Sequence, residues 1–167
     1  MRLLLALACA SFLGACAAPV VVNVGVPFDA AAAQRMLADG PNTVRGNAFL
    51  RQRGGGVVTC AGAEVVLVPA TAYAQRVFAA LYGTSAGAAM QAPNTVDIQP
   101  KSVQFSKLLR RTQCDAQGNF VFERVADGDW FVETTITWVV GNSPQGGPIM
   151  RRVSVAGGSS VTVIVAP

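Results

Sequence analysis

The fold prediction depends most on residues 112–132, which read TQCDAQGNFVFERVADGDWFV. Two turn signals, residues 115–119 and 126–129, contain the Asp, Asn and Gly that tight reversals of the backbone require. They enclose a predicted strand over residues 120–123, and a longer predicted strand over residues 130–140 follows them. In the longer strand the even-numbered residues share one face, which we expect to face the core, because strand side chains alternate between faces.

The same pattern of apolar strands and glycine-rich turns continues on both sides of this segment. We expect further strands over residues 44–51, 64–69, 101–112, 149–155 and 161–165, an extension of a hairpin arm over 57–60, and turns over 53–56, 142–148 and 157–158. Residues 84–100 are small, polar and interrupted by proline, and we interpret them as a long surface loop.

Two stretches have helical spacing instead. Asp29 can cap a helix over residues 29–39, which a Gly-Pro pair ends. Thr71 can cap a second helix over residues 71–82, which a glycine ends. The sequence therefore predicts a mainly β fold: a seven-stranded β-sandwich with two short helices.

The pattern in residues 112–132, Thr-x-x-Asp-x-x-Gly-x-Phe-x-Phe-x-x-Val-x-x-Gly-x-aromatic, resembles the carboxypeptidase regulatory-like domains of the transthyretin-like (prealbumin-like) fold. Residues 44–46 and 63–67 look like the first two strands of that family. The resemblance covers residues 44–166 and implies a transthyretin-like sandwich that acts as an accessory or binding module. Residues 71–100 depart from the pattern, because the family usually has a short connection there. Such turn-and-strand motifs are informative about fold and weak for function.

The N-terminus carries a targeting signal. A positive charge at Arg2 precedes an apolar run over residues 3–13, which is too short to span a bilayer as a permanent helix. Residues 13–16, LGAC, resemble the lipobox of bacterial lipoprotein signal peptides, in which the cysteine is lipidated and becomes the new N-terminus. An ordinary secretory signal, cut after one of the two alanines that follow Cys16, is the alternative.

This resemblance divides the chain into three parts. It implies a cleaved signal peptide over residues 1–15, a tether lipidated on Cys16 with a short helix over 16–43, and the sandwich over 44–167. Several acyl chains, such as palmitate, make a membrane anchor durable. Ala17 stands where an aspartate would favour the inner membrane, so we expect an outer-membrane lipoprotein facing the periplasm.

Cysteine and histidine usage limits the chemistry. Beyond the signal and the anchor, the chain contains only Cys60 and Cys114, and two thiols in an oxidising compartment predict a disulfide, with two separate buried thiols as the alternative. The chain has no histidine, which removes Ser-His, Cys-His and most zinc sites. We therefore expect no enzyme, no cofactor and no metal site. The 13 basic residues against 9 acidic ones are too mild a balance to indicate nucleic acid as a partner.

One glycine-rich turn and one set of three aspartates resemble ligand sites only superficially. Residues 53–56, RGGG, lack the Gly-Lys-Ser/Thr ending of a phosphate-binding loop, so we interpret them as a hairpin turn. Asp115, Asp127 and Asp129 do not have the spacing of a calcium loop, so we interpret them as turn residues.

Two arginine pairs, at residues 110–111 and 151–152, are the clustered charges on predicted strands. Charged side chains on strands commonly protect sheet edges. The alternative is that they bind an anionic glycan or lipid of the envelope.

Aromatic and acidic side chains give two more candidates. Tyr73, Tyr82 and Trp138 could stack on sugar rings, although core packing is the usual role of aromatic residues in a small sandwich. Glu64 and Glu133 are not paired at the spacing that glycosidases use.

We therefore expect a non-catalytic envelope lipoprotein whose sandwich is an interaction or structural module. Its expected partners are the membrane, through the lipid, and either another envelope protein or an anionic glycan. The alternative function is a carbohydrate-binding module for peptidoglycan or a surface glycan. That alternative predicts exposed aromatic side chains on one sheet or in residues 71–100, and burial of Trp130 and Trp138 together with both tyrosines would count against it.

Overall fold

The structure is a computed structural model that describes residues 20–90 and 96–167. It is organised around a long antiparallel hairpin. Its strands, β9 (Gly128–Val140) and β10 (Ser143–Val155), are paired along their whole length. They lie inside a five-stranded sheet of order β5-β10-β9-β4-β7. The other strands of that sheet are β4 (Glu64–Pro69), β5 (Gly87–Ala89) and β7 (Arg110–Gln113), and every pairing in it is antiparallel.

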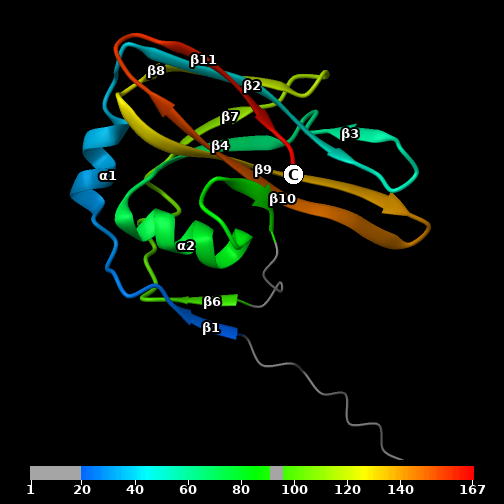
Figure 1. Ribbon diagram of the computed structural model, residues 1–167, viewed down its shortest axis with the longest axis horizontal. Helices are drawn as coiled ribbons and strands as arrows, with labels where there is room; N and C mark the ends of the chain where they lie inside the picture. The colour runs from blue at the N-terminus through cyan, green and yellow to red at the C-terminus, as the bar shows by residue number, and fades with distance from the viewer. Residues whose placement is uncertain (1–19, 91–95) are drawn as a thin grey trace, which may run out of the picture.

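A second sheet faces the first and completes a β-sandwich (Figure 1). Its central strand, β2 (Asn42–Arg51), pairs in parallel with β11 (Ser160–Val165) on one side and antiparallel with β8 (Asn119–Val125) on the other. The last residues of β2 pair with the short strand β3 (Val57–Thr59). The predicted mainly β fold and its sandwich architecture are confirmed, and the short strands β3 and β5 bring the two sheets to nine strands rather than seven.

The core between the sheets follows the alternation of the long strand. Trp130, Val132 and Ile136 are at most 2 % exposed and belong to the main apolar cluster, as the even-numbered pattern predicts. Val44 and Val65 meet them from β2 and β4 with no exposed surface. Burying side chains of this size supplies the main driving force for the two sheets to stack.

Helix α2 (Ala72–Tyr82) covers the outer face of the five-stranded sheet, below the sandwich in Figure 1. Thr71 caps its first turn and Gly83 ends it in the left-handed conformation, so this predicted helix is confirmed. The ring of Phe78 stacks on Phe131 with centroids 4.3 Å apart. The odd-numbered face of β9 is therefore buried as well, but only where α2 covers it.

The described part of the predicted tether contains regular structure. Strand β1 (Val20–Asn23) pairs in parallel with β6 (Val96–Gln99), and the two lie beside α2 (Figure 1). Helix α1 (Ala30–Leu37), capped by Asp29 as predicted, follows and buries Ala33 completely.

Three local predictions need correction. Residues 84–100 are not one loop, because they contribute β5 to the main sheet and β6 to the pair with β1. The strand predicted over 101–112 is confined to its end, β7, because residues 103–107 form a turn closed by hydrogen bonds from the Lys107 and Leu108 N–H groups to the Gln104 carbonyl. The turn predicted over 142–148 is the first half of β10, whose glycines and prolines still pair with β9.

A disulfide joins Cys60 to Cys114, and both residues are buried in the main core, which confirms the predicted pairing. Cys60 directly follows β3 and Cys114 directly follows β7, so the bond links the two sheets. Cys16 and the predicted signal peptide lie outside the described residues. Within residues 20–90 and 96–167, each helix is too short and insufficiently apolar to cross a membrane.

Candidate functional site

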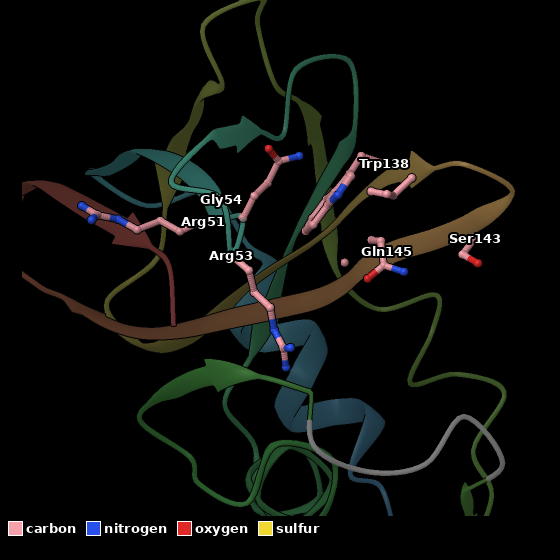
Figure 2. Close-up of a pocket in the computed structure, with 9 residues that line it drawn as sticks. Arg51, Arg53, Gly54, Trp138, Ser143 and Gln145 are labelled. Carbon is pink, nitrogen blue, oxygen red and sulfur yellow. The ribbon is translucent and has the colours of Figure 1, made fainter.

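One end of the sandwich opens into a hollow between two hairpins. One wall is the loop between β2 and β3, and the other is the projecting tip of the β9–β10 hairpin (Figure 2). The hollow has a volume of about 700 Å³, within the usual range for a site that binds a small molecule. We call it the hairpin-end hollow, and its lining residues are Arg51, Gln52, Arg53, Gly54, Trp138, Val140, Ser143, Gln145 and Gly146.

Trp138 enters this hollow because it continues the stripe of core residues along β9. It lies on the same face as Trp130 and Ile136, but near the tip of the hairpin the second sheet no longer covers that face, and Trp138 is half-buried. Gln145 lies directly opposite Trp138, and Ser143 opposite Val140, so all four side chains share that face. An aromatic ring and two hydrogen-bonding side chains therefore line one wall.

Gly146 lets the indole lie close to the strand. Its φ of +89° is in the left-handed region, and a Cβ there would come within 2.1 Å of the Ile136 carbonyl oxygen and 2.8 Å of the Trp138 ring. Any larger residue would displace the ring or the backbone under it.

The opposite wall is a tight hairpin turn, as predicted for residues 53–56. The Gln52 N–H donates to the Gly56 carbonyl at 2.8 Å, and the Gly55 N–H donates to the Gln52 carbonyl at 2.9 Å. Arg51 and Arg53 project from this wall, and both are exposed. Figure 2 shows the two arginines extending in different directions from the loop, with Trp138, Gln145 and Ser143 on the facing hairpin.

The arginine pairs singled out from the sequence lie elsewhere and are occupied by the protein itself. Arg111 Nη1 lies 2.5 Å from Glu64 Oε1, and Arg152 Nη2 lies 2.6 Å from Asp129 Oδ2. Arg110 donates to the Arg124 carbonyl at 2.6 Å, and Arg151 donates to carbonyl groups at the end of β11 and just beyond it. These contacts favour a structural role for both pairs. The edge interpretation fits Arg110 and Arg111 on the edge strand β7, but not Arg151 and Arg152, because β10 lies between β5 and β9.

Most of the aromatic side chains proposed for sugar stacking are inside the protein. Tyr73 and Tyr82 are at most 3 % exposed, and Trp130 has no exposed surface. Trp138 is the one among them that reaches solvent. The core-packing interpretation is therefore confirmed for Tyr73 and Tyr82, and not sugar stacking, because α2 turns both rings toward the sheet and the β1–β6 pair.

The carboxylates serve structural contacts. Asp115 accepts hydrogen bonds from the Asn119 side chain and from the backbone of residues 117 and 119, which lowers its pKa and closes the turn before β8. Hydrogen bonds from Ser154 and Arg152 likewise lower the pKa of Asp129. Glu133 lies under α2, where Tyr82 donates a hydrogen bond to it at 2.5 Å. Among the described residues no group of three His, Cys, Asp or Glu is placed to hold a metal ion.

A second hollow, of about 460 Å³, lies between α2 and the segment around β6. Its lining is largely apolar, including Tyr73, Leu81 and Phe105. Its two charged side chains, Asp97 and Lys101, neutralise each other at 2.9 Å. It therefore offers few polar groups with which to select a ligand.

The hairpin-end hollow is not predicted from local sequence patterns, because its walls come from two distant segments, residues 51–54 and 138–146. One signal was available. The predicted core face of the long strand carries a tryptophan, Trp138, near its far end, beyond the length that a short facing strand can cover.

The chain is similar in structure to a crystal structure from Pseudomonas aeruginosa described as a "putative carbohydrate binding protein". The TM-score is 0.68 at 18% sequence identity, and the match covers 84% of this chain and 97% of that one. At this identity the similarity shows a shared fold. An overlap with chlorocatechol 1,2-dioxygenase from Pseudomonas putida, at 14% identity over 94% of this chain and 68% of that one, has a TM-score of 0.33 and carries no argument. No protein-family model and no curated protein matches the chain. Membership in the carboxypeptidase regulatory-like family therefore stays a prediction.

Proposed function

We propose that this protein is a non-catalytic envelope lipoprotein whose β-sandwich binds carbohydrate in the hairpin-end hollow. The observation that carries the proposal is the half-buried Trp138 beside Gln145 and Ser143, on the wall of a hollow of about 700 Å³. Sugar rings offer apolar faces that stack on aromatic rings, and their hydroxyl groups need hydrogen-bonding partners beside that ring. The description of the Pseudomonas aeruginosa protein with this fold is in keeping with such a role.

The chemistry of the lining supports binding rather than catalysis. Its side chains are arginine, glutamine, serine, tryptophan and valine, apart from glycines. General acid–base catalysis needs a group that exchanges a proton near the working pH, and arginine keeps its charge throughout that range. These groups can hold and orient a ligand.

Tryptophan fluorescence provides a direct test, because the chain has two tryptophans and one of them has no exposed surface. Acrylamide should therefore quench mainly Trp138, and a bound sugar should protect it. We would titrate the full protein, kept in a detergent without a sugar headgroup, with chitotriose, cellotriose and maltotriose. At least one trisaccharide should reduce quenching, and Trp138→Ala should weaken its binding roughly tenfold or more by calorimetry.

Trp138→Phe is the matched control, because it keeps an aromatic face and should retain part of the affinity. The proposal fails if no sugar binds, or if a sugar binds with the same affinity to the wild type and to Trp138→Ala. The latter outcome would place the sugar elsewhere on the sandwich.

The envelope anchor is tested separately. Labelled palmitate should be incorporated into the wild-type protein and not into Cys16→Ser, which should leave the membrane fraction. Uptake of label by Cys16→Ser, together with continued membrane pelleting, would contradict lipidation at Cys16.

A further inference from the structure

The charged side chains in the lining of the hairpin-end hollow all have the same sign. Arg51 and Arg53 are positive, and none of the nine lining residues is acidic. A neutral sugar requires no such charge. The arrangement therefore carries information about the ligand beyond its being a carbohydrate.

These two arginines differ from most arginines of the sheets. Arg110, Arg111, Arg124 and Arg152 each lie within 3.8 Å of a carboxylate oxygen. In the part of the chain that the structure describes, neither Arg51 nor Arg53 takes part in an ion pair or a side-chain hydrogen bond. Their guanidinium groups can therefore pair with a ligand without first breaking a contact within the described residues.

The loop holds both arginines at one wall. Arg51 is the last residue of β2, and the two backbone hydrogen bonds of the turn fix the chain just after it. A guanidinium group presents a planar fork of N–H donors that matches a carboxylate or phosphate. In Figure 2 the Arg51 side chain extends to the side of the loop away from Trp138, so it would reach only an anionic group of a ligand that continues past the loop, whereas Arg53 extends to another side.

We propose that the hairpin-end hollow binds an acidic glycan, one whose sugars carry carboxylate or phosphate groups. This inference rests on the proposed carbohydrate binding. Trp138 would stack on a sugar ring, Gln145 and Ser143 would meet its hydroxyl groups, and Arg53 and Arg51 would pair with the anionic groups. Both arginines are exposed, so salt should weaken their contribution.

The test compares an acidic and a neutral sugar built on the same backbone. Trigalacturonic acid and its methyl ester share one backbone, and mannose 6-phosphate and mannose form a second pair that carries phosphate instead of carboxylate. Calorimetry on the full protein should show tighter binding of the acidic member of at least one pair, with a preference that shrinks as salt rises. Which pair shows it identifies the anionic group.

Arginine variants then locate the charge recognition. Arg53→Gln and Arg51→Gln should each weaken binding of the acidic sugar about fivefold, the upper range for an exposed ion pair, and leave the neutral member unchanged. Arg45→Gln is the matched control, because Arg45 is also exposed on β2 but does not line the hollow. It removes the same charge and should leave both affinities unchanged.

Each remaining outcome overturns the inference in a distinguishable way. Equal affinity for the acidic and neutral sugars, lost in Trp138→Ala, would refute the charge preference and leave the proposed function standing. An equal loss of affinity for the acidic sugar in Arg45→Gln would show that the preference comes only from the overall positive charge of the protein. Inorganic phosphate that binds as tightly as mannose 6-phosphate would show a simple anion site. Absence of any sugar binding would refute both proposals.

Discussion

The two halves of the β9–β10 hairpin have the same alternation and different surroundings. In the half that lies within the sandwich, Trp130 and Phe131 point to opposite faces and neither has exposed surface, because the second sheet covers one face and α2 the other. In the projecting half Trp138 is half-buried, while Val139 and Val140 are 69 % and 60 % exposed.

In a strand, the face on which a side chain lies and the burial of that side chain are two separate properties. Alternation determines the face on which a side chain lies, and it does so equally well in both halves. Whether that face is core or surface depends on how far the neighbouring layers extend. A residue that would complete the core in one half is half-buried in the other, where we propose that it binds a ligand.

Replacing the tryptophan in each half gives the largest expected contrast. Trp130→Ala leaves a large cavity in the main core and removes the hydrogen bond from its indole N–H to the Ala126 carbonyl, so it should cost about 3–5 kcal/mol of unfolding free energy. Trp138→Ala should cost less than about half of that. Denaturant unfolding measures both, and equal losses would break the comparison.

Removal of the disulfide tests how much this bond stabilises the stacking of the second sheet on the five-stranded sheet. Cys60 and Cys114 are 54 positions apart, so the double serine variant should lose about 4 kcal/mol of unfolding free energy, mainly because its unfolded chain gains freedom. The wild type under reducing conditions should match the variant. An unchanged midpoint in denaturant would show that the sheets remain stacked without the bond.

Gly146→Ala addresses the projecting half alone. The left-handed backbone and the close Ile136 carbonyl oxygen should make this change cost about 1–3 kcal/mol, and movement of the Trp138 ring should weaken sugar binding. Gly54→Ala, in the same hollow, is the control, because no atom lies within 4 Å of an added Cβ there. Similar effects of the two changes would show that bulk in the hollow, rather than support of the ring, matters.

The smallest effect concerns the face under α2. Burial raises the pKa of Glu133 above its usual value of 4.5, although the hydrogen bond from Tyr82 opposes the shift. The folded state thus binds the Glu133 proton more tightly than the unfolded state. The stabilisation that this protonation gives to the folded state is therefore greatest below pH 4.5 and is lost as pH rises through the raised pKa. Glu133→Gln keeps an acceptor for Tyr82 and should raise Tm at neutral pH.

The advantage of Glu133→Gln should disappear as the pH falls below 4.5, where the glutamate itself is protonated. Glu123→Gln, on the exposed face of β8, serves as the control. A lower Tm for Glu133→Gln at neutral pH would mean that the ionised carboxylate stabilises the contact with α2.

Local signals predicted the parts of the fold that local chemistry determines. Asp29 and Thr71 cap their helices as expected, and the even-numbered face of β9 is the core face. The glycines and prolines before Ile149 predicted a turn, yet that stretch pairs with β9 because the reversal occurs earlier, between Val140 and Ser143. Pairing partners of this kind outweigh local preference.

The candidate site was harder to predict for the same reason. Placing the reversal between Val140 and Ser143 would have set Gln145 opposite Trp138 and revealed one wall. The other wall depends on how β2 and β3 stack over the long hairpin, which no local pattern contains. From the sequence, Arg51 is therefore predicted to end a strand and Arg53 to begin a glycine turn, and neither is predicted to bind a ligand.

The Cys60–Cys114 bond has a consequence for how a ligand enters. Cys60 lies at the base of the hairpin that carries Arg51 and Arg53, and β7, which Cys114 follows, is joined through β4 to the strand that carries Trp138. The disulfide and the hydrogen-bonded strands β7 and β4 thus connect one wall to the other. We expect the gap between the walls to be set before a glycan arrives, so that selection depends on fit to a preformed width and little ordering entropy is lost on binding.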